Sequence, residues 1–456
     1  MFLLFHSPGN VSKIFYLFLS LLLSTNITLH AQVIIAQDNA GGYGGIWTNG
    51  SNGGFGFEAW NLNSSPGSGF AGWFLGNPSD AGISGLSDPS FGLFANPESS
   101  GAFVNADRDF FQPLPVGATF SFQWGVNWDS DGTGNKGINI YSGGAGGTQL
   151  ININMGGSAA MTINGDAMFS EYGTQAMTLH FELLSETQLR VYGTGRDGVE
   201  IYDNIFNIYA APDAVRFYAS NLATGDQRQP YFNNLQIAFP ENAILTNDLT
   251  VDGILITEGS SLNLNENTLT LAEDGFFENN GTFSHGNGSV ILKNATEIQG
   301  SSQSQFYIAV VDGNDISFGP YTDGFPKSSI LNTLEIQSGF IKTNGAPELQ
   351  EGSTLFYRSN GNYQRTEEWN NPWNVRIGFE TNLDLNINAW GDDIIIRGNL
   401  IIDENSSLTV DNGIDSLDLI IEGDLFLNGT LTLSESSRLD LQIQGNWNRG
   451  GNFEHN

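Results

Sequence analysis

The second half of the chain repeats itself, and this repeat limits the possible folds more than any other feature of the sequence. The tripeptides Gly-Asn-Leu at 398–400, Gly-Asp-Leu at 423–425 and Gly-Asn-Trp at 445–447 each open a β-like run, and they start 25 and 22 residues apart. A unit of roughly 20 to 25 residues made of short strands cannot bury its own apolar face. Stacking the units as coils solves this, so we expect a β-solenoid over 241–456.

Other short echoes extend the repeat upstream. Ser-Ser-Leu occurs at 260–262 and 406–408, and Asn-Gly-Thr occurs at 280–282 and 428–430. The alternative is a second meander or sandwich of hairpins, which Asn-Gly turns would also suit. The turn-to-turn spacing is longer than hairpins need, which favours the solenoid. We expect the stretch 306–377 to interrupt the repeat as an irregular insertion.

Residues 32–240 have a different character, with aromatic-rich strands separated by clusters of Gly, Asn and Ser. Phe120, Phe122 and Trp124 alternate with smaller or polar residues, which is the period of a strand with one buried face. No window keeps a helical period for three turns. We therefore predict an all-β chain whose N-terminal domain is a jelly-roll-like β-sandwich. The expected strands are 118–126, 137–141, 149–155, 177–184, 188–193, 214–219 and 232–239.

The end of this region, Gln-Pro-Tyr-Phe-Asn-Asn-Leu-Gln-Ile at 229–237, resembles the last strand of concanavalin-like and carbohydrate-binding jelly rolls. The resemblance covers about nine residues. It implies that the final strand of the sandwich returns beside the first.

The segment 352–370 resembles a stretch of large secreted proteins of the type IX secretion route. Their solenoid regions carry a similar Leu-x-Tyr-x-Ser-Gly-Gly-x-Tyr-x-Arg-x-x-Glu-Trp pattern followed by a strand, here 374–377; this chain departs from the pattern at Phe356 and Asn360. The resemblance implies a C-terminal sorting domain. Because the chain stops in mid-repeat at 451–456, we expect a truncated reading frame or fragment, whose last coil would expose apolar surface.

The first 31 residues are typical of a signal peptide. Lys13 precedes an apolar run over 14–23, and Leu29-His30-Ala31 has the form of a cleavage site. The alternative is a membrane anchor, but about ten strongly apolar residues fall short of the roughly 20 that a spanning helix needs. We expect a secreted or cell-surface protein.

Charge and cysteine content narrow the possible partners. The chain has 49 acidic and 16 basic residues, a formal charge of -33, so nucleic-acid phosphates would be repelled. It has no cysteine, so neither disulfides nor thiolate metal sites hold the fold.

One loop has the composition of a Ca²⁺ site. Asp129, Asp131, Thr133 and Asn135 alternate along a glycine-containing loop and offer the oxygen ligands that Ca²⁺ prefers. The loop resembles the opening of Asp-x-Asp-Gly calcium loops but lacks the bidentate Glu at the twelfth position. The alternative is an ordinary turn rich in Asp and Gly.

Tryptophans in glycine-rich loops are candidates for sugar binding, because sugar rings pack on exposed aromatic faces. Trp47, Trp60, Trp73 and Trp128 lie in or near such loops. The alternative for each is burial in the core. Burial is favoured for Trp124, whose neighbours alternate as a buried strand face does.

The sequence offers little material for catalysis. Past the signal segment, the histidines are His180, His285 and His455, and none has a partner motif. A catalytic pair of carboxylates remains formally possible. With 49 acidic residues, however, some will pair by chance, and a solvated acidic surface is the simpler interpretation.

These observations favour a non-catalytic, adhesin-like surface protein in which a solenoid carries a carbohydrate-binding sandwich. One alternative is a polysaccharide-degrading enzyme, a lyase or glycoside hydrolase with a catalytic β-helix. Another is a structural spacer without a ligand. The sparse Lys and Arg of the solenoid favour a stalk over a catalytic cleft.

Overall fold

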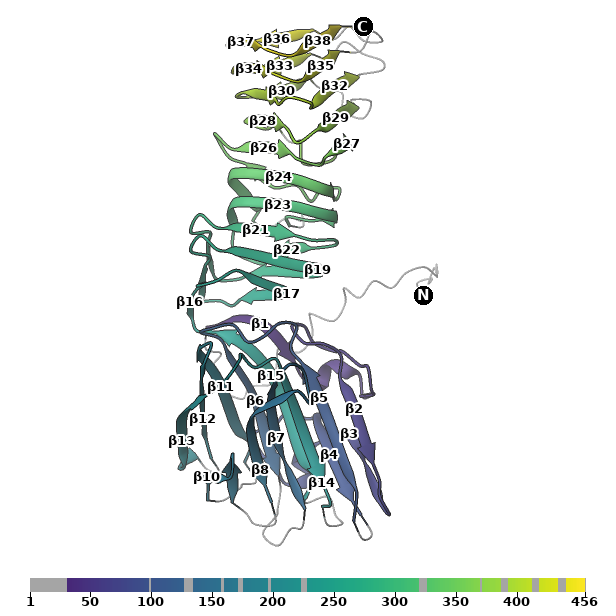
Figure 1. The fold of residues 1–456 in the computed structure, drawn as a ribbon, viewed down its shortest axis with the longest axis vertical. Coiled ribbons are helices and arrows are strands. Elements are labelled where there is room, and N and C mark those ends of the chain that lie inside the picture. Colours follow the sequence, from purple (N-terminus) through teal and green to yellow (C-terminus); the bar gives the residue numbers. More distant parts are fainter. Residues whose placement is uncertain are drawn as a thin grey trace, which may run out of the picture.

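The computed structural model describes residues 31–97, 100–126, 134–156, 160–170, 175–195, 198–222, 228–319, 326–369, 371–386, 393–411, 418–433 and 440–455. The described chain is built of strands and two short 3₁₀ helices, η2 (Ala40–Tyr43) and η3 (Pro78–Ala81). A sandwich forms one end of an elongated molecule and a stack of coils forms the rest (Figure 1). None of the described helices is long and apolar enough to span a membrane.

The N-terminal sandwich consists of two antiparallel sheets. The strands of the first sheet are β1 (Val33–Asp38), β3 (Phe70–Gly76), β4 (Ser90–Asn96), β6 (Thr119–Val126), β11 (Met177–Ser185), β12 (Gln188–Thr194), β13 (Ile201–Asn207) and β15 (Pro230–Phe239). The strands of the second are β2 (Asn61–Ser65), β5 (Phe103–Asp109), β7 (Asn135–Ser142), β8 (Thr148–Met155), β9 (Met161–Ile163), β10 (Asp166–Phe169) and β14 (Ala214–Ser220). All seven expected strands are confirmed to within two residues at each end.

The core between the two sheets is aromatic. Phe120, Phe122 and Trp124 on β6 all point inward and are 1% exposed or less, as their alternation predicts. From the second sheet, Phe217 stacks on Phe232 of the first with ring centroids 3.7 Å apart. Large planar rings therefore fill the space between the sheets.

The last strand of the sandwich returns beside the first, as the resemblance to jelly rolls implies. β15 pairs antiparallel with β1, with Val33 opposite Phe239 and Asp38 opposite Leu235. On its other side β15 pairs with β6.

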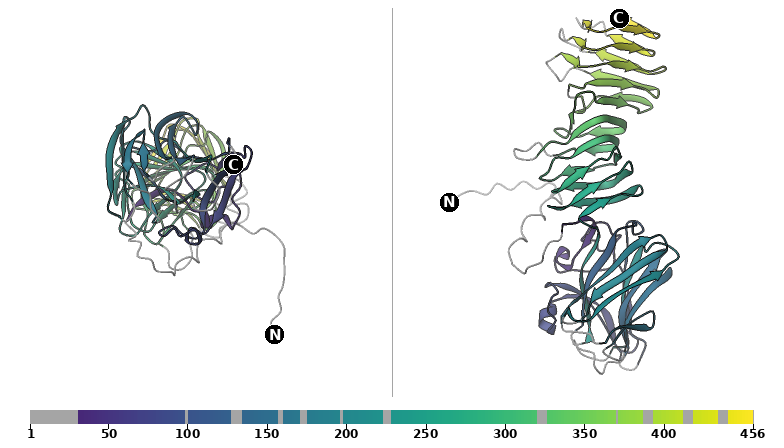
Figure 2. Two further views of the ribbon diagram at one scale, coloured as in Figure 1. Left: turned by 90° about the horizontal axis from the view of Figure 1, so that it is seen from below. Right: turned by 90° about the vertical axis from the view of Figure 1, so that its left-hand side faces the viewer.

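β1 also connects the sandwich to the solenoid. Its first residues pair antiparallel with the first long solenoid strand, β17 (Leu249–Ile256), with Val33 opposite Ile256. The backbone N–H of Gly56 donates 2.8 and 3.0 Å hydrogen bonds to the two carboxylate oxygens of Asp252. The sandwich thus covers the first coil and supplies the strand partner that a solenoid end otherwise lacks (Figure 2).

The C-terminal half is a solenoid of parallel strands. The strands on its continuous long sheet after β17 are β19 (Thr268–Asn279), β21 (Ser289–Leu292), β22 (Glu297–Gln299), β23 (Gln305–Ile316), β24 (Ser329–Ile341), β25 (Glu348–Leu349), β26 (Thr354–Tyr357), β28 (Asn374–Ile377), β31 (Leu400–Ile402), β34 (Leu425–Leu427) and β37 (Trp447–Arg449). Shorter sheets complete the coils: β16 (Asn242–Ile244), β18 (Ser261–Asn263) and β20 (Thr282–Ser284); β27 (Gly361–Gln364), β29 (Thr381–Asn386), β32 (Ser407–Asp411), β35 (Thr430–Leu433) and β38 (Asn452–His455); β30 (Ile394–Ile396), β33 (Leu419–Ile421) and β36 (Leu441–Ile443).

The register of these strands explains the sequence repeat. Successive pairings place one inward position of each coil directly on the same position of the next. The column reads Leu249, Leu269, Val290, Ala309, Leu334, Leu355, Val375, Leu400 and Leu425, and it ends at Trp447, which is 42% exposed. In the last coils the polar residue that opens each coil also stacks: the backbone N–H of Asp424 donates to Oδ1 of Asn399, 25 positions earlier, at 2.8 Å, and the equivalent bonds form at Asn399 and Asn446. The Gly-Asn-Leu signature therefore marks a turn. The side-chain oxygen of its Asn accepts a hydrogen bond from the backbone of the next coil.

The stretch 306–377 does not interrupt the repeat, so that expectation was wrong. β23, β24, β26 and β28 continue the same parallel sheet in sequence. The pattern is harder to see in the sequence because β23 and β24 have 12 and 13 residues, and because aromatic residues replace Leu at some inward positions.

The segment that resembles type IX secreted proteins forms one ordinary coil with a buried polar centre. Glu368 is 1% exposed, accepts a 2.9 Å hydrogen bond from the Tyr357 hydroxyl, and accepts a second from the backbone N–H of Thr366. The Trp369 ring stacks on Tyr357 with centroids 6.2 Å apart. The pattern therefore encodes a packed, hydrogen-bonded coil.

Candidate functional site

Two of the four tryptophans proposed for sugar binding are buried. Trp60 is 1% and Trp47 is 5% exposed, and the two rings meet edge to face at 5.2 Å. Both also contact Phe91 and Phe232. At these two positions the alternative of burial in the core applies, because the loop that carries them folds over the aromatic core.

The remaining tryptophans differ in their burial. Trp73 on β3 is half-buried, and its indole Nε1 donates a 3.1 Å hydrogen bond to the backbone oxygen of Trp47. Trp128 lies outside the described residues. Trp124, for which burial was favoured, is fully buried.

The predicted Ca²⁺ loop is also mostly outside the described residues, which include neither Asp129, Asp131 nor Thr133. Asn135 is exposed at the start of β7, and its Oδ1 accepts a 3.1 Å hydrogen bond from Nδ2 of Asn154. Within the described ranges, no three His, Asp or Glu side chains form a group that could hold a metal ion. The Ca²⁺ site stays a prediction, which calorimetric titration of the chain with Ca²⁺ tests.

A polar face on the outside of the first sheet is the best-formed candidate site. Outward-pointing residues of β11, β12 and β13 lie in register, so that His180 is opposite Tyr192 and Tyr192 is opposite Asp203. The His180 and Tyr192 rings stack with centroids 4.6 Å apart and an interplanar angle of 8°. Burial lowers the pKa of His180 to about 4, so the imidazole is neutral at pH 7.

A charged network fixes this pair of rings from one side. The guanidinium of Arg190 lies 4.6 Å from the centre of the Tyr192 ring. It donates two hydrogen bonds of 2.8 and 2.7 Å to the carboxylate of Asp203 and a third of 3.1 Å to Glu182. Hydrogen bonding to Arg190 lowers the pKa of Asp203. Asp203 is therefore a fixed, ionised acceptor beside the rings.

Next to these rings the sheet surface is hollowed. The hollow has a volume of about 310 Å³, and its walls combine hydroxyl, amide, carboxylate and ring groups. Its polar and aromatic lining residues are Gln175, Thr178, His180, Tyr192, Thr194, Tyr202 and Asp203. No Lys or Arg is among its described lining residues. Such a surface offers many neutral hydrogen-bonding partners around planar rings, which suits a polyhydroxylated ligand.

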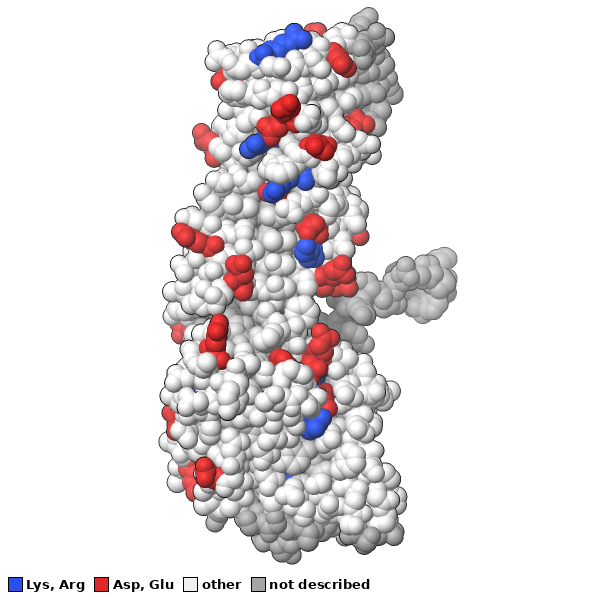
Figure 3. All heavy atoms as spheres, viewed as in Figure 1, with Lys and Arg blue, Asp and Glu red and all other residues white. Residues whose placement is uncertain are grey.

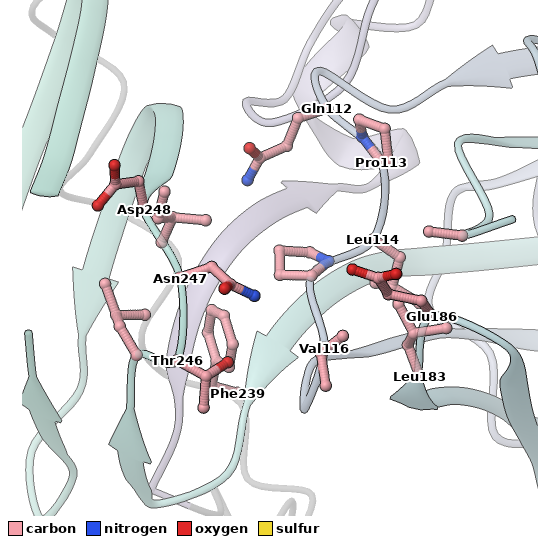
Figure 4. A pocket seen from close by; sticks show the side chains of 14 residues that line it. Gln112, Pro113, Leu114, Val116, Leu183, Glu186, Phe239, Thr246, Asn247 and Asp248 are labelled. Atoms are coloured by element: carbon pink, nitrogen blue, oxygen red, sulfur yellow. The ribbon is translucent and has the colours of Figure 1, made fainter. Parts of the chain in front are cut away.

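A second pocket, of about 220 Å³, lies where the sandwich meets the solenoid (Figure 4). Leu114, Leu183 and Phe239 are buried residues of its apolar wall. Asn247 and Glu186 bring polar groups to it from the solenoid side and the β11–β12 turn. It lacks planar rings stacked beside fixed acceptors, so it is the weaker candidate for a sugar.

The surface charge agrees with the composition. On the face shown in Figure 3, Asp and Glu are scattered over both parts of the molecule, while Lys and Arg are few. Several of the solenoid cations pair with acids, including Arg358 with Glu335 at 3.1 Å and Arg376 with Asp403 at 2.9 Å. The exposed field is therefore unfavourable for phosphate polymers.

The sequence contains a signal for the outer-face site, although His180 by itself is an isolated histidine without a partner motif. The strand pattern placed His180 and Tyr192 at outward positions of two adjacent strands. What could not be read from the sequence is the pairing register, which brings the two rings together.

Comparisons with known proteins give only distant structural similarities. No protein-family model and no curated protein sequence matches the chain. Among solved structures, a glycosyl hydrolase family protein from Mycobacterium fortuitum matches 32% of this chain and 74% of its own, with 12% identity and a TM-score of 0.24. The cellulose induced protein Cip1 matches 39% of this chain and 90% of its own, with 12% identity and a TM-score of 0.27.

A third similar structure is the exoplasmic/lumenal domain of VIP36 in its Ca²⁺/Man3GlcNAc-bound form. It matches 39% of this chain and 81% of its own, with 10% identity and a TM-score of 0.24. Similarity of this size is distant and assigns no function to the chain.

Proposed function

We propose that the chain is a non-catalytic glycan-binding protein of the adhesin-like kind, exported by its N-terminal segment, whose solenoid holds the sandwich away from its point of attachment. The observation that carries the proposal is the hollow beside the stacked His180 and Tyr192 rings. Sugars combine apolar C–H faces with hydroxyl groups, and rings flanked by fixed acceptors recognise both.

The chemistry of the hollow defines the ligand class. Asp203 accepts hydrogen bonds and stays ionised, Thr178 and Thr194 offer hydroxyls, and Ile201 adds apolar surface. The described lining carries one acid and no base, and Arg190 pairs with that acid, so the hollow has no excess positive charge to bind uronic acids or sulfated sugars. The expected ligand is a neutral glycan.

A glycan array probed with the full chain tests this proposal. We expect binding to neutral glycans that Asp203→Asn and Tyr192→Ala reduce at least about tenfold. Glu186→Gln, which changes an exposed acid at the junction pocket, is the matched control and should leave binding unchanged. An array without hits, or binding lost only in Glu186→Gln, would overturn the proposed site.

A further inference from the structure

β13 is an edge strand of the sandwich. It pairs with β12 along all seven of its residues, and within the described ranges no strand pairs with its other side. In Figure 1 it lies at the outer margin of the first sheet. The backbone N–H of Ile205 has no strand acceptor and is bonded instead by the Asn204 side-chain oxygen at 2.9 Å. The edge therefore presents backbone groups that can accept another strand.

Large apolar side chains are exposed along this edge. The exposed fractions are 80% for Val199, 79% for Ile201, 52% for Ile205 and 93% for Tyr209. Native edge strands are usually protected by charges, prolines or bulges. On β13 the single charged residue is Asp203, and Arg190 neutralises it. An exposed apolar edge of this kind is a typical pairing surface.

The sequence of β13 suits antiparallel pairing with β13 of a second copy, with the two-fold axis at Asn204. Tyr202 and Phe206 stand two positions on either side of it, and both are partly buried against the core. In an antiparallel pair related by a two-fold axis at Asn204, Tyr202 would face the partner's Phe206 and Asp203 would face the partner's Ile205. This register pairs aromatic side chains twice and avoids placing two acids opposite each other.

We propose that two copies of the chain associate through β13, so that the first sheet of one sandwich continues into that of the other. The formal charge of -33 opposes association elsewhere on the surface, whereas this edge is locally neutral and apolar. If the glycan site proposed above is correct, the dimer would place two hollows on one continuous sheet and raise the avidity for repeated glycans.

Sedimentation velocity of the full chain tests the dimer without reference to any glycan. We expect a dimer, and we expect the double variant Ile201→Lys/Ile205→Lys to be monomeric with an unchanged unfolding midpoint, because both side chains are exposed. Asn63→Lys is the matched control, since Asn63 is an exposed Asn on β2, the edge strand of the other sheet. It should leave the dimer intact. A monomeric wild type would overturn the proposal.

Cross-linking gives a second test that does not depend on the lysine variants folding. The chain has no cysteine, so a single introduced cysteine can form a disulfide only between molecules. Asn204→Cys should give a disulfide-linked dimer under mild oxidation, while Asn63→Cys should not. Equal cross-linking of both variants, or a dimer in which Asn204→Cys fails to cross-link, would contradict pairing through β13.

Discussion

Arg108 and Asp38 form a completely buried ion pair inside the sandwich, with Nη2 of the arginine 2.8 Å from Oδ2 of the aspartate. The Tyr43 hydroxyl donates a 2.7 Å hydrogen bond to the same carboxylate, and the Arg108 guanidinium also donates to Oδ1 of Asn52 at 2.6 Å. Burial raises the pKa of Asp38 and lowers that of Arg108, while the pairing opposes both shifts.

Removing one partner of this pair should be costly, because the other charge stays buried. We expect Arg108→Met to lower the free energy of unfolding by about 3–5 kcal/mol, measured by urea denaturation. The double variant Arg108→Met/Asp38→Asn should recover part of that loss. A single variant as stable as the wild type would show that the pair is not buried as described.

The inward column of the solenoid predicts a contrast between adjacent residues. Leu400 is fully buried in the column, whereas Ile401 points outward and is half-buried. Leu400→Ala should lower the free energy of unfolding by about 2–5 kcal/mol. Ile401→Ala should cost clearly less, and similar losses in denaturation experiments would argue against the register.

Much of the fold could be predicted because the apolar pattern fixes which face of each strand is buried. The alternation around Phe122 and the Gly-Asn-Leu repeat at Leu400 are both local patterns. The role of β1 could not be predicted, because pairing Val33 with both Phe239 and Ile256 joins segments more than 200 residues apart. The burial of Trp60 likewise depends on Phe232, which lies 172 positions further along the chain.

His180 predicts a pH dependence of stability. Burial lowers its pKa from the ordinary 6.5 to about 4, so the unfolded chain binds this proton more readily than the folded chain. The contribution of His180 to stability is therefore complete above about pH 6.5 and declines as the pH falls toward 4. We expect the unfolding free energy of His180→Gln, followed by denaturation from pH 7 to 4, to fall less than that of the wild type. Parallel pH curves would refute this.

The buried hydroxyl of Tyr357 predicts a specific loss in the solenoid. It donates a 2.9 Å hydrogen bond to Glu368, and both residues are 1% exposed or less. Tyr357→Phe keeps the ring that stacks on Trp369 but removes this donor, which should cost about 1–3 kcal/mol of unfolding free energy. Thermal or urea unfolding measures the loss, and a neutral substitution would mean that the carboxylate does not need this bond.

The residues of the candidate site could not be predicted from the sequence, because they come from different strands. The glycine-rich loop position made Trp47 a candidate for sugar binding, yet its ring lies in the core. The hollow instead combines His180, Tyr192 and Asp203 from three strands, and their meeting depends on register and on the outward side of each strand. Neither the register nor the outward side can be read from one segment of the sequence alone.

Hydrogen–deuterium exchange of the full chain, with and without a neutral glycan identified on the array, is the most direct measurement of the central claim. We predict that saturating glycan slows exchange in the backbone around the hollow, over residues 175–194 and 198–203, and leaves the solenoid from 246 onward unchanged. Slower exchange confined to the junction loops at 112–116 and 245–249, or along the solenoid, would contradict a glycan site on the outer face of the sandwich.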